Sequence, residues 1–228
     1  YKSLGEMKEL SSGVTDNVKS LNKVLTNVKA RGTWAEVQLG NILDETIPNM
    51  YVTNVKTNPA YDGRVEFAVR IPAKENDEIT YLPIDSKFPM EDYIRLSAAA
   101  ENGNYDELEK ARKALETRVK DEAKLVKKYI APPNTTPFAI LYLATEGLYA
   151  EIASGKSGIA ETLQAQGVMI AGPSTITALL NSLAMGFRTI AINKKANEVW
   201  KVLGAAKTQY EKFGTLLQKA KDKIEAAG

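Results

Sequence analysis

The stretch from Gly63 to Pro89 contains two strand-like runs separated by a polar turn. Val65–Ile71 is mainly apolar and rich in β-branched residues, and Ile79–Ser86 follows after the polar residues 72–78. Two such runs joined by a short polar connection are typical of an antiparallel β-hairpin. The chain must therefore contain a sheet, and the helical patterns around it predict an α/β class with a mixed sheet flanked by helices.

Further elements are predicted on both sides of this hairpin. Phe138–Leu143 is continuously apolar, which indicates a strand buried on both faces. Strands are also predicted over 51–57 and 168–171. Helices are predicted from Pro89, with Glu91 and Asp92 in its first turn, over 104–130, 146–154 and 158–166, and after Gly172. The apolar side of the helix over 104–130 is predicted to consist of Leu108, Ala111, Leu115, Val119, Leu125 and Val126.

A helix is predicted over residues 34–46, and Pro48 ends it. Thr33 suits the N-cap, and Glu36 three residues later completes a capping box. The apolar residues of this helix that we expect to be buried are Trp34, Val37, Leu39, Ile42 and Leu43.

Both ends of the chain carry apolar residues at alternating spacings of four and three, which is a coiled-coil pattern. The first set is Val14, Val18, Leu21, Leu25 and Val28, and the second is Val199, Leu203, Ala206, Tyr210, Phe213, Leu217, Ala220 and Ile224. The two helices could pair as a stalk, form a homo-oligomer interface, or each pack on the core alone. The predicted organisation is an N-terminal coiled-coil helix over 1–30, an α/β core over 31–190 and a C-terminal coiled-coil helix over 191–228.

The composition restricts the chemistry that the chain can perform. It contains no Cys and no His, which excludes disulfides, thiolate metal sites and histidine-based catalysis. Any bound metal must use oxygen ligands, which favours Mg²⁺, Mn²⁺ or Ca²⁺. The formal net charge is only +2, so a surface that binds nucleic acid would have to be a local patch.

The sequence also gives expectations about location. We find no continuous apolar run near the roughly 20 residues that span a bilayer, and no signal peptide. The expected location is the cytoplasm, without membrane contact from these residues. The chain begins at Tyr1 and is helical in pattern at both ends, so we expect it to be part of a longer protein.

The strand residues at the end of the hairpin carry the candidate chemistry. In a strand, Asp85 and Lys87 project to one side and Ser86 to the other. The partner strand can bring Glu66 beside Asp85, since cross-strand neighbours lie about 5 Å apart. Two such carboxylates can hold a divalent cation that activates water and polarises a phosphate, with Lys87 stabilising the developing charge. The alternative is an ordinary surface ion pair.

Several motifs occur in a fixed order along the chain. They are Arg31-Gly32-Thr33-Trp34-Ala35-Glu36-Val37-Gln38-Leu39, Ile84-Asp85-Ser86-Lys87-Phe88-Pro89, Ala144-Thr145-Glu146, and Pro173-Ser174-Thr175-Ile176-Thr177-Ala178-Leu179-Leu180 followed by Gly186-Phe187-Arg188. In these motifs, and over residues 30 to 225, the chain resembles the RmuC family of bacterial DNA recombination proteins. Helices with heptad patterns flank the core in that family too.

The resemblance implies a restriction-endonuclease-like core of the PD-(D/E)xK nuclease superfamily. It implies that Glu36 is the acid from the first helix and that Asp85 and Lys87 form the (D/E)xK pair. Glu66 stands where the family pattern has the Asp of Pro-Asp, so Glu66 and Asp85 would hold the metal, Mg²⁺ or Mn²⁺. The chain departs from the pattern at Val65-Glu66, where Glu keeps the carboxylate but adds a methylene.

The resemblance further implies DNA as the partner and a role in limiting DNA rearrangement. Longer family members often carry an N-terminal anchor in the inner membrane. The alternative to a nuclease is a catalytically degenerate nuclease fold that binds DNA and acts through its coiled coils.

Other polar residues are candidates for contact with substrate. Gln38 and Arg188 are predicted to contact DNA, Arg188 as part of a phosphate-contacting patch with Lys194, Lys195 and Lys201. A solvated helix face is the alternative for this patch, and for Gln38 the alternative is a merely solvated side chain. Glu146 follows an apolar strand and could cap the next helix or line the mouth of the site.

Overall fold

The computed structural model describes residues 28–72, 79–155 and 157–225. Most of the predicted N-terminal coiled-coil segment, and most of the predicted turn over 72–78, lie outside these residues. The chain divides into two compact units, Tyr1–Asn181 and Ser182–Gly228. Each is described separately below, and the domain boundary expected between residues 190 and 191 stays a prediction.

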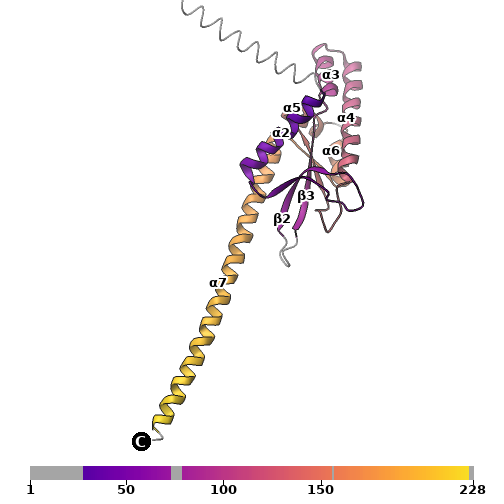
Figure 1. The fold of residues 1–228 in the computed structure, drawn as a ribbon. Helices are drawn as coiled ribbons and strands as arrows, with labels where there is room; N and C mark the ends of the chain where they lie inside the picture. Colours follow the sequence, from indigo (N-terminus) through magenta and orange to yellow (C-terminus); the bar gives the residue numbers. More distant parts are fainter. Residues whose placement is uncertain (1–27, 73–78, 156, 226–228) are drawn as a thin grey trace, which may run out of the picture. The chain divides into compact units, whose positions relative to one another are not determined.

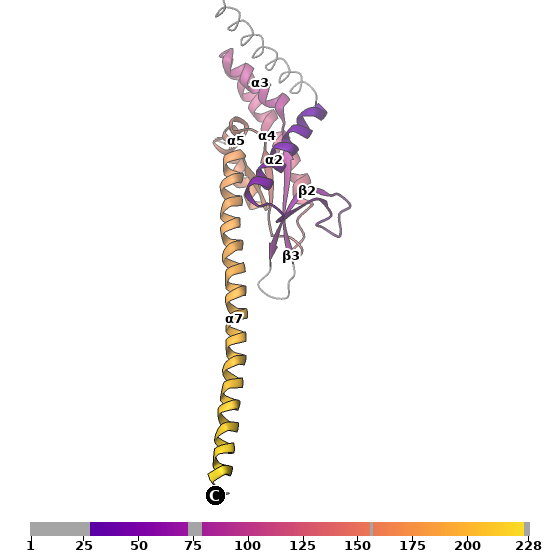
Figure 2. The same cartoon turned by 60° about the vertical axis from the view of Figure 1, so that its left-hand side comes forward.

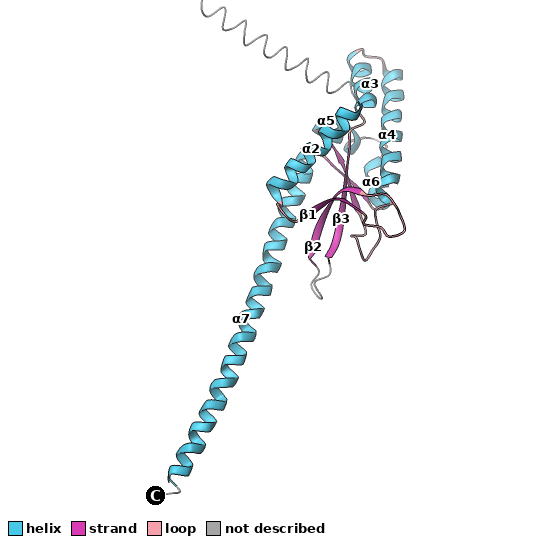
Figure 3. Cartoon of the chain, viewed as in Figure 1, coloured by secondary structure: helices cyan, strands magenta, loops and turns pink. Residues whose placement is uncertain are grey.

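A mixed sheet forms the centre of the first unit (Figure 3). Its strands are β1 (Tyr51–Val55), β2 (Val65–Pro72), β3 (Ile79–Lys87), β4 (Ala139–Leu143) and β5 (Val168–Ala171), in the order β1-β2-β3-β4-β5. The β1–β2 and β2–β3 pairs are antiparallel, and the β3–β4 and β4–β5 pairs are parallel. The predicted hairpin is confirmed, and all five residues of β4 are buried, as its apolar run predicted.

Helices surround this sheet (Figure 1). They are α2 (Val28–Thr46), α3 (Met90–Glu101), α4 (Tyr105–Lys127), α5 (Glu146–Ala153) and α6 (Ile159–Ala165). The last helix, α7 (Pro173–Glu225), begins in this unit and continues into the second. The side chains of Asn104 and Thr145 cap α4 and α5 by accepting hydrogen bonds from backbone N–H groups in the first turn. Figure 2 shows α3 and α4 lying side by side.

The core lies mainly between β4 and the helices that follow the hairpin. Ala139, Leu141 and Leu143 pack in one cluster with apolar residues of α3, α4, α5 and α6. Tyr142 points to the opposite face, where its hydroxyl donates to Gln38 Oε1 of α2 at 2.9 Å. The sheet is therefore covered on both faces, which is why β4 has no polar side for solvent.

The start predicted for the first helix of the core is wrong. The α2 helix runs continuously through Arg31 and Gly32, so Thr33 lies inside the helix and is not its N-cap. A helical Gly costs only about 1 kcal/mol relative to Ala, and the rest of the helix tolerates this cost.

The predicted buried face of α2 also needs correction. Trp34 is 36% exposed and Val37 is 54% exposed, whereas Leu39 and Leu43 are fully buried together with Ala35. The spacing of four between the buried residues gives a single narrow stripe toward the sheet, and this stripe leaves Trp34 and Val37 outside.

The α7 helix is one element, where the sequence suggested one helix after Gly172 and another from about residue 190. In the second unit it exposes apolar residues of the predicted heptads, including Val199, Leu203, Tyr210 and Phe213. Within Pro173–Thr215 it also contains an 18-residue window with a mean hydropathy of 1.3, which by length and composition alone could cross a membrane. The expectation that the chain has no apolar stretch long enough to cross a membrane is therefore corrected.

Candidate active site

The site lies where the β2–β3 ladder ends. Phe67 and Ile84 form the last pair in register at this end, and Glu66 and Asp85 are the next residues on their strands. Glu66 Oε2 accepts a hydrogen bond from the Ser86 backbone N–H at 2.8 Å and another from the Ser86 hydroxyl at 2.5 Å. The Glu66 carboxylate thus holds the end of β3.

The expectation that Ser86 faces away from the acids is wrong. Its hydroxyl contacts Glu66 because the long Glu side chain reaches across the ladder to the residue after Asp85. The methylene that distinguishes Glu from Asp at this position is what gives the carboxylate this reach.

Lys87 joins the two acids. Its ammonium forms an ion pair with Asp85 and lies 3.6 Å from Glu66 Oε1, and it donates a hydrogen bond to the Ser86 carbonyl at 3.0 Å. The structure therefore brings together Glu66, Asp85 and Lys87, as the hairpin predicted. In this arrangement the ammonium provides part of the positive charge that two close carboxylates require.

Burial controls the ionisation of this group. Asp85 is 3% exposed, and burial raises the pKa of its carboxyl to about 6. Lys87 opposes this shift, while the negative charges of Glu66 and Glu122 add to it. Burial alone would lower the pKa of Lys87, but Asp85 and Glu66 outweigh it and raise that pKa, so the ammonium stays charged.

A pocket of about 350 Å³ opens beside these residues and includes Glu36 of α2. Its lining residues are Gly32, Thr33, Glu36, Glu66, Ser86, Lys87, Phe88, Pro89, Arg118 and Glu122. Glu36 of α2 and Glu66 of β2 thus face one solvent-accessible space, and the buried Asp85 is not among the lining residues. The ring of Trp34 on α2 lies with its centroid 5.5 Å from that of Phe88, a lining residue that directly follows β3.

The other candidate residues lie elsewhere. Gln38 is half-buried and bonded to Tyr142, and burial raises the pKa of that tyrosine. Glu146 Oε1 accepts from the Ser174 backbone N–H at 2.5 Å, so this acid caps α7 and not the next helix, α5, which Thr145 caps. Arg188 lies on α7 in the second unit. Contacts of Gln38 and Arg188 with substrate stay predictions.

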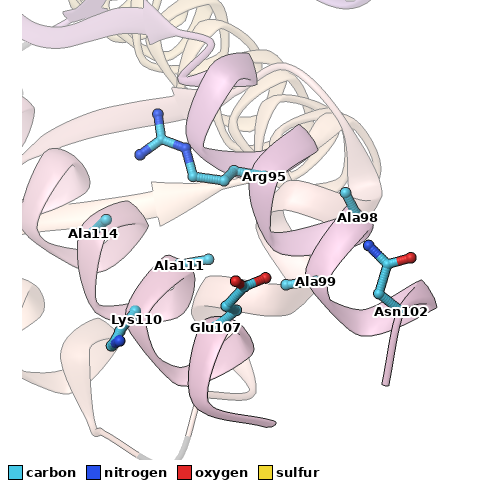
Figure 4. Close-up of a pocket in the computed structure, with 8 residues that line it drawn as sticks. All are labelled: Arg95, Ala98, Ala99, Asn102, Glu107, Lys110, Ala111 and Ala114. Carbon is cyan, nitrogen blue, oxygen red and sulfur yellow. The ribbon is translucent and has the colours of Figure 1, made fainter. Parts of the chain in front are cut away.

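A larger cavity, of about 410 Å³, lies between α3 and α4 (Figure 4). It is lined by Arg95, Ala98, Ala99, Asn102, Glu107, Lys110, Ala111 and Ala114. Half of these residues are alanines. The lining contains one acid, Glu107, and two basic residues, Arg95 and Lys110, so it offers no paired carboxylates. Volume alone does not identify the reactive site here.

The donor set beside β3 fits a hard cation in ligand type, because carboxylate oxygens are what Mg²⁺ and Mn²⁺ prefer. Over the described ranges, no group of three Asp, Glu, His or Cys residues is arranged to hold a metal ion. Magnesium commonly binds through one or two carboxylates and completes its shell with water and phosphate. Glu66 and Asp85 could therefore hold such an ion only if the two carboxylates contact the ion and the Lys87 ammonium at the same time.

Two charged residues that line the pocket were not predicted from the sequence. Arg118 and Glu122 come from α4, and Glu122 is buried although it belongs to a highly charged helix. The sequence pattern placed Leu125 on the buried side, but Leu125 is 44% exposed. The signal available was spacing, since Glu122 continues the series Leu115, Val119 and precedes Val126 at intervals of four, three and four.

Comparison with known proteins gives a consistent result. The model of the family described as "RmuC family" matches residues 1–228. A protein of Xylella fastidiosa strain Temecula1, named "DNA recombination protein RmuC homolog", is 47% identical over 231 residues, which cover 100% of this chain and 50% of that protein.

More distant relatives carry the same name. The homolog of Neisseria meningitidis serogroup A is 24% identical over 204 residues, covering 85% of this chain and 34% of the relative. The homolog of Pseudomonas aeruginosa is 21% identical over 221 residues, covering 95% and 48%. The chain thus spans half or less of the length of these curated relatives. No solved structure matches it significantly.

Proposed function

The chain belongs to the RmuC family, and on that premise we propose that its α/β unit is a divalent-metal-dependent DNA nuclease domain acting in DNA recombination. The relatives' name supports the process, and the pocket beside β3 supports the reaction. The single observation that carries the reaction is the gathering of Glu36, Glu66 and Lys87 around one pocket, with the buried Asp85 ion-paired to Lys87.

The proposed division of labour follows from the contacts. Glu66 and Asp85 would hold Mg²⁺ or Mn²⁺, which when bound lowers the pKa of a water ligand and polarises a phosphoryl oxygen. Lys87 remains charged beside the acids and stabilises negative charge that develops on the phosphate. Glu36, which is exposed on the pocket wall, orients the attacking water.

A second function is favoured by one specific observation. Lys87 already engages both strand carboxylates, and the described part of the chain has no three-ligand acid cluster. This arrangement suits a degenerate nuclease fold that binds DNA without cutting it. In that case the Glu66–Lys87–Asp85 group acts as a structural clamp at the end of the β2–β3 ladder.

The test of the first function is cleavage of single-stranded and branched DNA by the purified chain in Mg²⁺ or Mn²⁺. Asp85→Ala and Lys87→Ala are each expected to abolish cleavage. Asp62→Ala and Lys56→Ala serve as matched controls, because these residues form an exposed ion pair with an N–O distance of 2.8 Å and do not line the pocket. Undiminished cleavage in both site variants would remove the assignment.

Metal binding separates the two functions. Titration of Mn²⁺ by calorimetry into the wild type is expected to give heat that the Glu66→Ala/Asp85→Ala double variant lacks. DNA binding by a wild type that takes up no metal and cuts no DNA would instead support the degenerate fold.

A further inference from the structure

Glu122 occupies a position on α4 that packing alone would give to an apolar residue. It follows Leu115 and Val119 and precedes Val126 along the buried stripe of the helix, and it is only 9% exposed. A buried carboxylate is unfavourable unless it is paired. A buried Glu122 on this stripe therefore needs a partner that compensates its charge, and its presence needs an explanation other than packing.

The partner is Arg118, one turn earlier on the same helix. Arg118 Nη2 lies 2.9 Å from Glu122 Oε1, and the Arg118 side chain is 58% exposed while that of Glu122 is 11% exposed. The acid thus lies inside and the guanidinium faces outward, and both residues line the pocket that contains Glu66 and Lys87. The negative charge of Glu122 also contributes to the raised pKa of Asp85, after burial, Lys87 and Glu66.

Charge in the pocket explains what Arg118 can do there. Glu36, Glu66 and Glu122 are acids on the wall, and Lys87 is held by Asp85 and Glu66. A phosphodiester approaching these acids needs a cation that can still reach it. A guanidinium has five N–H donors in a planar fork, so Arg118 can keep its bond to Glu122 and still donate to phosphate oxygens.

We propose that Arg118 binds a DNA backbone phosphate at the mouth of this pocket and that Glu122 is the positioning residue that fixes its guanidinium. The inference rests on the proposed function, because it takes DNA as the ligand of the pocket. It adds an anion-binding residue that neither the hairpin motif nor the family resemblance assigns.

Another arginine on α4 provides a matched control. Arg112 is ion-paired to Glu109 at 2.8 Å and to Glu151 at 2.7 Å, and it lines a different pocket. Arg112→Ala removes the same charge from the same helix without touching the candidate site. Any loss that both variants share reflects net charge alone.

The experiment is fluorescence anisotropy with a labelled single-stranded oligonucleotide and a labelled branched junction, measured over a series of salt concentrations. Arg118→Ala is expected to weaken binding by about 10-fold and to reduce the slope of log K against log salt by about 1. Arg118→Lys should keep the slope but recover only part of the affinity, and Arg112→Ala should match the wild type.

Glu122 is tested by the same readout. Glu122→Ala is expected to weaken binding although the positive charge of Arg118 remains, and Glu122→Gln should recover part of it because its amide oxygen can still accept from Arg118. A circular-dichroism melting curve for each variant separates this effect from loss of fold.

Each outcome decides the matter. If the wild type binds DNA and Arg118→Ala binds with unchanged affinity and salt slope, the inference is overturned, while the proposed function is decided separately by cleavage and metal binding. If the wild type neither binds nor cuts DNA, both are overturned. If Arg112→Ala weakens DNA binding as much as Arg118→Ala does, the inference is also overturned, because the loss of affinity then depends on net charge.

Discussion

At the scale of single residues, the site depends on a buried acid that is expensive to ionise. Asp85 has a folded-state pKa of about 6, against an ordinary value of 3.8, mainly because it is buried. The folded protein therefore holds this proton more tightly than the unfolded chain does. By linkage, the contribution of Asp85 to stability is present at low pH and is lost as the pH rises from about 4 to about 6.

Asp85→Asn should remove this penalty. In the presence of EDTA at about pH 8, we expect the variant to be more stable than the wild type by about 1–3 kcal/mol, the upper value corresponding to the full shift. The loss of the ion pair with Lys87 reduces the gain. Urea unfolding across the pH range measures the difference, which should shrink toward about pH 4. A wild type more stable than the variant at neutral pH would contradict the assignment of Asp85 as a destabilising buried acid.

At the scale of elements, the turn from α6 into β5 requires a glycine. Gly167 has φ of 85°, and a Cβ built on it would lie 3.0 Å from the Pro137 carbonyl oxygen. The helix α6 ends at Ala165 with Gln166 as its C-cap, and Val168 begins the edge strand β5. The alignment of β5 with β4 thus depends on a backbone conformation that side chains with a Cβ disfavour.

Gly167→Ala is expected to lower the free energy of unfolding by about 1–3 kcal/mol, because of the positive φ and the close carbonyl. Gly204→Ala is the matched control, since Gly204 lies inside α7 with nothing within 4 Å of a built Cβ. That change should be neutral or stabilising, because Ala favours helix. Chemical unfolding of both variants gives the comparison, and an equal effect of the two would refute the argument from φ.

The exposed heptad face of α7 has a consequence for assembly. Val199, Leu203, Tyr210 and Phe213 are each more than half exposed and follow the spacing of a coiled-coil seam. We predict that the chain self-associates through this face and that Leu203→Asp makes it monomeric at micromolar concentration.

Size-exclusion chromatography with light scattering measures the assembly directly. Thr208→Asp is the control, because Thr208 lies outside the seam and its hydroxyl already bonds to the Gly204 carbonyl of its own helix. A wild type that is monomeric over the accessible concentration range would rule out the oligomer predicted from the heptads.

At the scale of the whole molecule, the hydrophobic core belongs almost entirely to the first unit. Among the described residues, every buried apolar side chain except Phe187 lies within residues 28–181. A chain ending at Asn181 is therefore expected to unfold cooperatively, with a free energy of unfolding within about 1 kcal/mol of the full chain. Urea unfolding followed by circular dichroism tests this, and a broad, non-cooperative transition would show that the second unit is needed for the fold.

Much of the fold could be predicted because its signals are local. The apolar run of β4, the hairpin of β2 and β3, and the acids at the start of α3 each depend on neighbours in the sequence, and the structure confirms these elements. The pairing of Asp85 with Lys87 was predictable for the same reason, since residues two apart in a strand share a side. The hairpin alone predicted that Glu66 would join them, because it places Glu66 across the ladder from Asp85.

The errors share one physical cause, which is that burial depends on what lies opposite an element. Trp34 and Leu125 are apolar and were expected inside, yet both are exposed, while the charged Glu122 is buried. A helix sequence allows several apolar stripes, and the neighbour that packs on it selects one.

The sequence by itself determined the class of the fold, the hairpin, and the oxygen-only chemistry of a chain without Cys or His. Only the tertiary structure decided that Glu36, Glu66, Arg118 and Glu122 share one pocket, and that Ser86 bonds to Glu66. These residues come from α2, β2, β3 and α4, so no local pattern relates them. Their meeting follows from how the helices pack on the sheet, and packing is a property of the whole chain.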